Sequence, residues 1–478
     1  MKKHYLYYLL AIVAGVVSIS SCKNKPAEQK VDDAATATKA PYTVTLEEVN
    51  SDFAPALQSF AWAQAGGELL ILGGRTNGFH NFSGTSSVFT PKRRNTYFYV
   101  VDLDSSKTDS LSIPAAFLDR LSATNMEYYH EGNTLYCIGG YGVSGKGCDV
   151  DSPPASCYQT FPYLTAINVP AAITAIQNQN SAALASAITS SAADDRLRVT
   201  GGELHKIGNW YYLVFGQNFN TIYNPNSTGI YTNEVRRFQI DNSGTTPKIT
   251  GYAADTCTWD DSSFHRRDLV VLESYDVNGN PNITVYGGVF TPQANIDYQT
   301  PIYISQADAT TGATTITTDN NFLQQFNQYA APNIAFYDAA SKTTYTTILG
   351  GITQYYYDDK GNLVNSNNTQ DPMPFSNYAT TIVRTGSSTA VEYPQQSPTL
   401  PGYLGSEAIF VPHVSIVLSQ GRQKTIDMAK LPKSTDSKGI MLGYMYGGIE
   451  SKASQSTSDP NSTVSSKRIF KVYLKPNL

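Results

Sequence analysis

Six segments of this sequence share one pattern, in which a short apolar stretch runs into a pair of glycines. The segments are Leu69–Gly74, Leu135–Gly140, Tyr211–Gln217, Ile283–Gly288, Thr346–Gly351 and Gly443–Gly448. Successive copies lie 63 to 97 residues apart, and only the third replaces its second glycine, by Gln217. Such self-similarity along most of a 478-residue chain indicates structural units that stack side by side, so it outweighs the usual division of this length into about three domains.

Each repeat is predicted to contain three or four β-strands. One strand precedes each apolar-Gly-Gly strand, and a third follows, at Asn95–Leu103, Tyr163–Val169, Asn233–Ile240, Thr300–Ser305, Ser376–Val383 and Lys467–Leu474. A short fourth strand is predicted at Asp109–Ile113, Lys248–Tyr252, Thr314–Thr318 and Ala390–Tyr393. Four strands per repeat is the pattern of a propeller blade. The glycine pair suits a strand end where another backbone approaches closely and φ becomes positive.

With these features the chain resembles a kelch-type β-propeller, from Tyr42 to about Leu474. The resemblance implies an all-β fold with six four-stranded antiparallel blades, over residues 41–478. The sixth repeat ends at its third strand, whereas Tyr42–Val49 is a strand without a repeat of its own. We therefore expect Tyr42–Val49 to complete blade six and close the ring, which removes a free sheet edge.

Three insertions lengthen the repeats. Pro170–Asp195 predicts one or two short helices on the second blade, and Asn320–Tyr329 predicts another short helix. Gln420–Asp436 interrupts the last blade before its glycine strand. The first and the last of these are candidate docking elements if the protein is a subunit of a larger assembly.

Residues 1–22 predict an export signal. Lys2 and Lys3 precede an apolar run, Tyr5–Val17, that is short for a membrane span, and Cys22 follows it. The ending resembles a bacterial lipoprotein signal, which implies lipid attachment at Cys22 and anchoring in the outer membrane, on its periplasmic face or at the cell surface. The alternative is an ordinary secretory signal with an incidental cysteine. Polar residues 23–40 then form a tether, and the Tyr-rich body resembles lipoproteins of the Bacteroidota.

The remaining cysteines and the charges restrict the possible chemistry. Cys148 and Cys157 bracket a short loop and form either a disulfide or a pair of thiols, while Cys137 and Cys257 are expected to be small buried residues. Neither His nor Cys shows metal-ligand spacing, and nucleotide-binding motifs are lacking, so we predict no metal and no cofactor. A net charge of −5 without a basic stripe argues against a nucleic-acid partner.

The innermost strands of a propeller line a central channel. Aligning their starts places Gln58, Asn125, Gly201, Arg267, Asn333 and Glu407 at one level. These residues either line a channel in which they satisfy one another, or they form a ring that binds a small polar ligand such as a sugar, with Arg267 available to a carboxylate. The neighbouring cluster Phe264–Asp268 is either part of that site or a salt-bridged linker between blades.

Three functions follow from these alternatives. The first is a cell-envelope lipoprotein, not an enzyme, that binds a protein or glycan. The second is a sugar-modifying enzyme, because the kelch-type family includes six-bladed periplasmic sialic acid mutarotases; Arg267 would then hold an anion, and Glu407 or Glu127 would be the acid/base. The third is a subunit of an outer-membrane assembly. A compact pocket where Arg267 and an acid converge would favour the enzyme, and a narrow self-satisfied channel would exclude it.

Overall fold

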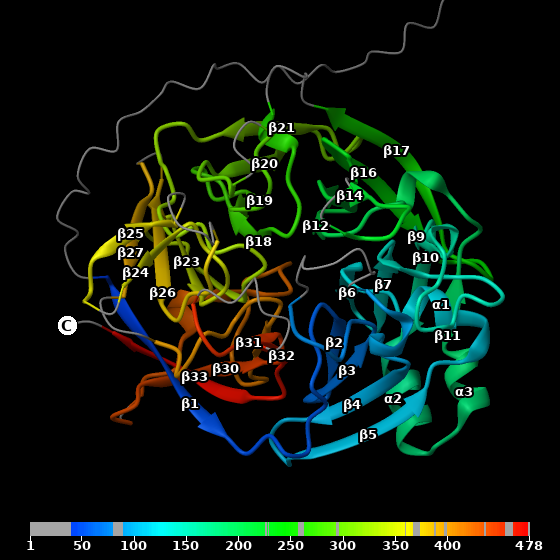
Figure 1. Ribbon diagram of the computed structural model, residues 1–478. Coiled ribbons are helices and arrows are strands. Elements are labelled where there is room, and N and C mark those ends of the chain that lie inside the picture. The colour runs from blue at the N-terminus through cyan, green and yellow to red at the C-terminus, as the bar shows by residue number, and fades with distance from the viewer. Residues whose placement is uncertain are drawn as a thin grey trace, which may run out of the picture.

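A computed structural model shows six sheets arranged as blades around a central axis (Figure 1). Five are four-stranded and antiparallel, and the sixth has four antiparallel strands and a fifth, parallel one. The structure describes residues 40–79, 89–224, 227, 229–256, 262–292, 296–358, 360–366, 373–386, 389–395, 399–434, 436–454 and 462–476. The predicted six-bladed propeller is confirmed. The expected export signal, tether and Cys22, and also Cys257, lie outside the described residues.

The strands of each blade run from the channel outward. Blade one contains β2 (Ala61–Ala65), β3 (Glu68–Leu72), β4 (Tyr97–Asp102) and β5 (Lys107–Ser112), and blade two contains β6 (Glu127–Glu131), β7 (Thr134–Ile138), β10 (Leu164–Asn168) and β11 (Ile188–Ser190). Blade three contains β12 (Glu203–Ile207), β13 (Trp210–Val214), β16 (Glu234–Asp241) and β17 (Lys248–Thr256), and blade four contains β18 (Val270–Tyr275), β19 (Pro281–Tyr286), β20 (Ile302–Gln306) and β21 (Thr314–Thr318). Blade five contains β22 (Asn333–Asp338), β23 (Thr343–Leu349), β26 (Ala379–Thr385) and β27 (Val391–Pro394), and blade six contains β28 (Ile409–Pro412), β30 (Ile440–Tyr446), β33 (Ile469–Pro476) and β1 (Tyr42–Val49).

The ring closes through β1, as the sequence predicts. This strand pairs antiparallel with β33 along its full length, from Tyr42 opposite Pro476 to Val49 opposite Ile469. The side chains of Tyr42 and Val44 are buried, and the Tyr42 hydroxyl lies 2.8 Å from Thr347 Oγ1 in blade five. The N-terminal strand therefore joins the two ends of the chain and also packs against the neighbouring blade.

The glycine pairs allow one blade to contact the linker to the next. Gly139 has φ +65°, and a Cβ atom there would collide with the carbonyl oxygen of Val199, which lies in the linker to blade three. Gly140 N–H donates to this same oxygen at 2.9 Å. A side chain at Gly139 would disrupt this contact, so the glycines belong to the scaffold.

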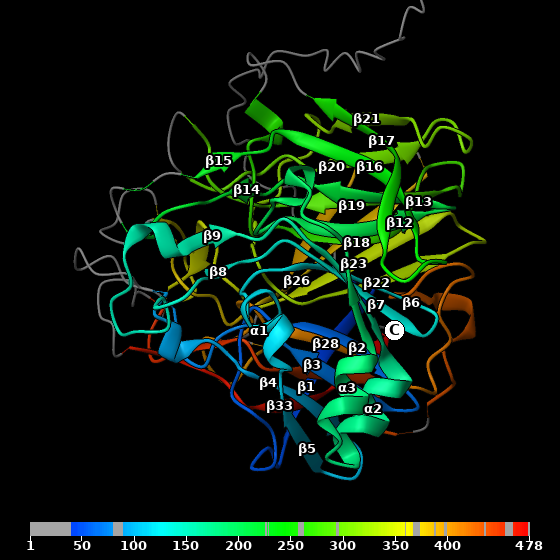
Figure 2. The ribbon, with the colours of Figure 1, turned by 90° about the vertical axis from the view of Figure 1, so that its right-hand side faces the viewer.

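Short hairpins rise from the blades directly after the glycine pairs. They are β8 (Tyr141–Val143) with β9 (Tyr158–Thr160), β14 (Gln217–Asn218) with β15 (Ile230–Tyr231), β24 (Tyr355–Tyr357) with β25 (Leu363–Asn365), and β31 (Ile449–Ser451) with β32 (Thr463–Ser465). Figure 2 shows β8, β9, β14 and β15 together on one side of the disc. These mouth hairpins deepen one end of the channel.

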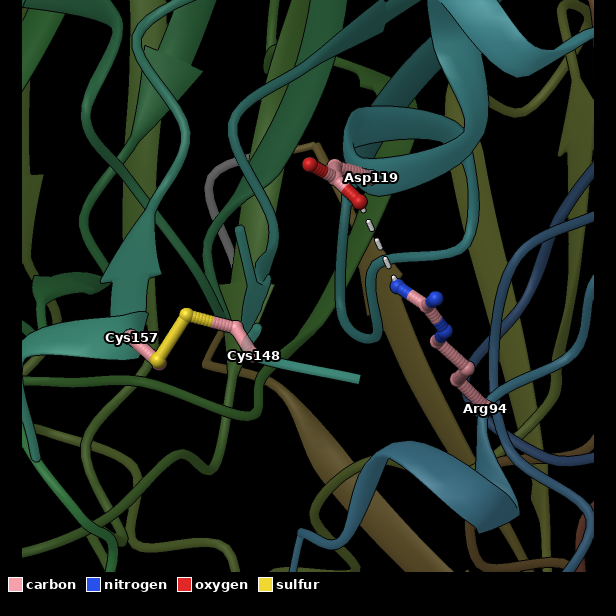
Figure 3. Close-up of a disulfide and its surroundings, with 4 residues drawn as sticks. All are labelled: Arg94, Asp119, Cys148 and Cys157. Atoms are coloured by element: carbon pink, nitrogen blue, oxygen red, sulfur yellow. Dashed lines mark hydrogen bonds and ion pairs between the residues drawn. A yellow bond between two sulfur atoms is a disulfide. The ribbon is translucent and has the colours of Figure 1, made fainter. Parts of the chain in front are cut away.

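A disulfide links Cys148 to Cys157 in the loop between β8 and β9 (Figure 3). Arg94 from blade one lies near this loop, with its guanidinium 3.4 Å from the Asp119 carboxylate and 3.3 Å from that of Asp149. The disulfide between Cys148 and Cys157, one of the two alternatives predicted from sequence, is therefore present. It holds a loop at the channel mouth. Cys137 is a buried free thiol, as expected.

The helices lie outside the ring. They are α1 (Leu118–Leu121), α2 (Val169–Gln177) and α3 (Ser181–Ser186), so the helices predicted within 170–195 are confirmed. Ile173 and Ile176 of α2 are buried in the core cluster shared by blades one and two. The apolar face is thus already covered, which leaves it unavailable for docking. Among the described residues, no helix is long and apolar enough to cross a membrane.

Two insertions differ from expectation. The helix predicted at Asn320–Tyr329 is wrong, because this segment is irregular: the Glu392 carboxylate accepts the N–H groups of Gln325 and Phe326 at 2.6 and 3.0 Å, so these donors need no helical partners. The last insertion contains β29 (Thr425–Asp427), which pairs in parallel with β22, the innermost strand of blade five. We call residues 413–431 the channel plug, because they place a fifth strand inside the channel.

Candidate functional site

A ring of backbone hydrogen bonds surrounds the channel where the innermost strands begin. Its six members all have positive φ, between 47° and 69°: Ser59, Asn125, Gly201, Asp268, Ala330 and Glu407. Around five of the six steps, the N–H of one member donates to the carbonyl of its equivalent in the preceding blade, at 2.5 to 3.3 Å. Because all six members share this conformation, the ring backbone is part of the scaffold. A specific binding function therefore depends on the side chains of the ring.

The ring corrects part of the predicted alignment. Asn125, Gly201 and Glu407 are members, as expected. Gln58 and Arg267 each precede the member of their blade by one residue, and Asn333 follows Ala330 by three. The error arises because the ring members are of different residue types, so only the apolar pattern aligns the strand starts. That pattern does not fix the alignment of a fully buried strand to within one residue.

The ring side chains meet across the channel. Asn125 Nδ2 lies 3.4 and 3.5 Å from the two Glu407 carboxylate oxygens. Burial, and next the negative charge of Asp268, raise the pKa of Glu407 to about 8. Burial also raises the pKa of Asp268, although Arg267 opposes the shift. At neutral pH Glu407 is therefore mainly a carboxylic acid, which can donate as well as accept a hydrogen bond.

A cavity of about 290 Å³, the upper cavity, lies between this ring and the mouth hairpins. Its floor contains the ring residues Ser59, Asn125, Asp268 and Glu407. Aromatic side chains form much of its wall: Phe79, Phe89, Tyr141, Phe219, Tyr223, Phe290 and Tyr329. A concave site with apolar walls and a few converging polar groups is the usual form of a small-molecule site.

The predicted site residues distribute between the upper cavity and its surroundings. Gln58, Asn125, Arg267 and Glu407 all line the upper cavity. Asn333 instead lines a chamber of about 140 Å³ on the other side of the ring. Glu127 lines neither; it is buried behind the ring, where its Oε1 accepts the Gly202 N–H at 2.9 Å. The structure thus brings together four of the six residues proposed from sequence.

Arg267 is held by partners within the protein. Its guanidinium forms an ion pair with Asp268 and donates to the hydroxyls of Tyr231 and Tyr223 at 3.1 and 3.0 Å. An anionic ligand would have to compete with Asp268 for this charge. Gln58 is similarly engaged, because its Nε2 donates to the carbonyl of Asn77 at 3.2 Å. Both residues thus position the floor and wall of the cavity.

The cluster Phe264–Asp268 divides between two roles. Arg266 is fully buried, and its guanidinium donates to the carbonyl oxygens of Ser263 and Gly287 at 2.6 and 3.0 Å. Arg266 thus anchors the linker before blade four through backbone carbonyl oxygens, whereas one alternative predicted a linker held by salt bridges. His265 stacks on Tyr231, with ring centroids 3.7 Å apart, and burial lowers its pKa. Arg267 and Asp268 alone from this cluster line the upper cavity.

Several cavity residues were not identified from sequence, although a signal exists. In five of the six blades the residue after the glycine pair bridges to the residue before the ring member, as in Arg75 with Gln58 and Tyr141 with Thr124. Arg75 and Tyr141 line the cavity, as does Gln217, whose bridge to Thr200 places it at the same repeat position. This corrects the predicted alignment of the third copy, because Phe215, with φ 56°, and not Gln217 takes the place of a glycine in the pair. Arg75 is buried, with its guanidinium over the Phe89 ring at 4.7 Å. The position after the glycines could therefore have been proposed as cavity-lining.

The channel plug blocks the channel below the ring. Arg422 Nη2 donates to the carbonyl oxygens of Ser274 and Asn282 at 2.8 and 3.1 Å. Gln423 N–H donates to the Glu273 carboxylate at 2.7 Å, and Tyr129 donates to its other oxygen at 2.8 Å. A ligand in the upper cavity therefore enters between the mouth hairpins. Among the described residues, no group of His, Cys, Asp and Glu is placed to hold a metal ion.

Comparisons with known proteins add the following. No protein-family model and no curated protein match this sequence. Among solved structures, one described as "Structure of YjhT" is similar, with 11% sequence identity and a TM-score of 0.47. The match covers 88% of this chain and 97% of that chain. The six-bladed architecture agrees with the divergent kelch-type propeller that the repeats indicate.

Proposed function

We propose that this protein binds a glycan in the upper cavity and is held at the outer membrane by a lipid on Cys22. The observation that carries the proposal is the combination of an aromatic wall with a floor of hydrogen-bonding side chains. Sugar rings present apolar C–H faces and hydroxyl edges, so they match such a surface. A volume of about 290 Å³ lies at the lower end of the range for ligand pockets.

The charges of the cavity floor favour a ligand whose contacting groups are uncharged. Arg267 is balanced by Asp268, and Glu407 is mainly protonated near neutral pH. Asn125 supplies an amide that can donate and accept. Sugar hydroxyl groups can form hydrogen bonds with Glu407, Asn125 and Asp268 while the ion pair between Arg267 and Asp268 stays in place. A carboxylate on the floor would instead meet Asp268.

A glycan array probed with the soluble body, residues 40–478, tests this proposal. We expect a restricted set of glycans to bind. Asn125→Gly should weaken binding about tenfold, because it removes an amide from the floor while glycine keeps the positive φ. Ala330→Gly is the matched control, since Ala330 is a ring member that does not line the upper cavity. Failure of all glycans to bind would contradict the proposal.

One observation favours an enzyme of the mutarotase type as the second candidate. Opening of a sugar ring needs proton donation to the ring oxygen and proton removal from the anomeric hydroxyl, and groups with pKa values near the working pH are the most effective. Glu407, with a pKa raised to about 8, is such a group at the cavity floor. Glu127 is buried away from the cavity and is not retained in this proposal.

Magnetisation-transfer NMR between the two anomers of each reducing sugar tests the enzyme candidate. A mutarotase should accelerate exchange, and Glu407→Gln should remove the acceleration while leaving sugar binding measurable. Sugar binding without faster exchange between the anomers would exclude the enzyme and support the non-enzymatic function. For the anchor, mass spectrometry of the native protein should find lipid on Cys22, and Cys22→Ala should release the protein from membranes. An unmodified Cys22 would contradict the membrane part alone.

The assembly function is tested with the intact lipoprotein. If the protein is a subunit of a larger outer-membrane complex, affinity purification from membranes in mild detergent should recover the same partner in stoichiometric amount. Recovery of the protein alone would exclude that function. Either outcome is compatible with glycan binding in the upper cavity.

A further inference from the structure

A second cavity, of about 260 Å³, lies at the opposite end of the channel. We call it the lower cavity, and we propose that it binds a small organic anion with an aromatic or aliphatic body. Its polar side is formed by Lys424 and His205, and its apolar side by Trp62, Tyr128 and residues of the channel plug. The site is independent of the glycan site proposed above.

The walls of the lower cavity come from two sources. Trp62 on β2 and Tyr128 on β6 belong to the innermost strands of blades one and two. Ile416 and Leu418 belong to the channel plug, which interrupts blade six. Since a regular propeller repeat has no such segment, the cavity is a feature of this chain's insertion. The plug is fixed by Arg422, so the cavity is preformed.

Lys424 supplies a positive charge to this cavity. Its ammonium lies 5.3 Å from the centroid of the Trp62 ring and 5.2 Å from that of Tyr128. Within the part of the chain that the structure describes, no carboxylate lies within 4.0 Å of this ammonium. Cation–π contacts orient the group between two rings but leave its three N–H donors available. A ligand carboxylate would pair with it.

His205 supplies a second polar group, whose Nε2 makes no hydrogen bond among the described residues although the Glu203 carboxylate lies 3.8 Å away. The residue is only 3% exposed. Burial, followed by the charges of Lys424 and Arg422, lowers its pKa to about 3, so the imidazole is neutral at physiological pH. A buried unsatisfied nitrogen costs stability. A ligand oxygen accepting from Nε2–H would satisfy it.

The acidic residue of the cavity, Glu273, is held by two hydrogen bonds and makes no ion pair with Lys424 among the described residues. Glu273 is buried, and its two carboxylate oxygens already accept from Tyr129 OH and from Gln423 N–H. The Glu273 carboxylate is therefore bound to the channel plug. Apart from the tryptophan and tyrosines, the hydrogen-bonding side chains on the rest of the lining are Lys424, His205, His130, Gln64, His413 and Gln423. Among the described residues, Nε2 of His205 and Nε2 of His130 have no hydrogen-bond partner. The flat rings of Trp62 and Tyr128 favour a planar apolar body beside the charge.

The two cavities are separated by the ring and by the chamber of about 140 Å³ beneath it. Lys424 and His205 line that chamber and the lower cavity, but neither lines the upper cavity. Variants at these two positions should therefore leave glycan binding unchanged. Conversely, Asn125→Gly should leave the lower cavity unchanged, which allows the two proposals to fail separately.

Benzoate and its neutral counterpart benzamide are suitable probes, measured by ligand-observed NMR titration of the soluble body. We expect saturable benzoate binding below about 10 mM and weaker binding of benzamide. Lys424→Met should weaken benzoate about tenfold without affecting benzamide, and Lys424→Arg should restore it. His205→Phe should also weaken benzoate. Lys433→Met is the control, because Lys433 is an exposed lysine near the plug.

Three results would overturn the inference. The first is benzoate binding that does not saturate, and the second is wild-type benzoate affinity in Lys424→Met. The third is loss of benzoate binding in Asn125→Gly, which would place the probe in the upper cavity. Thermal unfolding of each variant separates a lost site from a lost fold. If Lys424→Met unfolds early, Lys424→Arg decides, since an arginine retains the charge.

Discussion

Asn125 of blade two and Glu407 of blade six meet across the channel, with the amide nitrogen 3.4 Å from a carboxylate oxygen. Both occupy ring positions with positive φ, where either residue is conformationally costly and only glycine is not. Their backbones are fixed by bonds to neighbouring blades. The scaffold therefore presents two polar side chains at a fixed separation, which is the kind of preorganisation that a binding floor requires.

Stability should fall as the pH rises from about 5 to about 8. Glu407 keeps its proton up to a pKa of about 8 in the folded protein, but loses it near the ordinary value of 4.5 when unfolded. The folded state binds more protons in this window, so the free energy of unfolding decreases with pH. Burial raises the pKa of five further carboxyls in the same direction, namely Glu127, Glu203, Asp268, Asp297 and Glu392.

Urea unfolding of wild type and Glu407→Gln at several pH values measures this effect. The variant mimics the protonated acid, so its stability relative to wild type should be higher at pH 8 than at pH 5. Glu48→Gln provides a control of opposite sign, because Arg468 lowers the pKa of Glu48 and its contribution is lost on the acid side. Parallel pH profiles for wild type and Glu407→Gln would show that Glu407 titrates normally.

Two glycines with similar backbone conformation should respond differently to alanine. Gly139 has φ +65° and would place a Cβ against the Val199 carbonyl, whereas Gly132 has φ +56° and no atom within 4 Å. We expect Gly132→Ala to cost about 1 kcal/mol, from backbone strain alone. Gly139→Ala should cost more than about 3 kcal/mol, because two backbones must also separate. Chemical denaturation measures both, and equal costs would argue against the packing role of the glycine pair.

Closure of the ring by β1 can be tested with neighbouring substitutions. Val44 is buried against blade five, whereas Thr45 is exposed. Val44→Asp should lower the free energy of unfolding by about 3 kcal/mol or more, because it buries an unpaired charge. Thr45→Asp should change it by less than about 1 kcal/mol. If both variants unfold at the same denaturant concentration, β1 does not contribute to the cooperative fold.

Removal of the Arg422 side chain should loosen the channel plug. Arg422→Ala leaves the buried carbonyl oxygens of Ser274 and Asn282 without these donors, so a loss of about 2–4 kcal/mol is expected. Hydrogen exchange should then rise at β29 while β22 to β27 of blade five stay protected. Lys433→Ala, at an exposed site just after the plug, is the control. Unchanged exchange at β29 would show that other contacts hold the plug.

The repeat predicted the six-bladed propeller because the glycine pairs occupy positions that few other residues can take. At Gly139, for example, φ is positive and a Cβ atom would collide with the Val199 carbonyl. The ring positions carry no such marker, since Ser59, Asp268 and Ala330 share one conformation without sharing chemistry. The plug was missed because β29 is three residues long and pairs with a strand far away in sequence. Of the aromatic residues in the cavity wall, Tyr141 and Tyr329 occupy repeat positions, whereas Phe79, Phe89, Tyr223 and Phe290 lie in connecting segments that follow no repeat.

The most direct measurement is calorimetric titration of the strongest array glycan into wild type, Asn125→Gly and Ala330→Gly. Binding on the floor of the upper cavity predicts one site per chain, about tenfold weaker binding by Asn125→Gly, and wild-type affinity for Ala330→Gly. Equal affinity for all three proteins would place the glycan elsewhere and contradict the assignment of the upper cavity as the binding site.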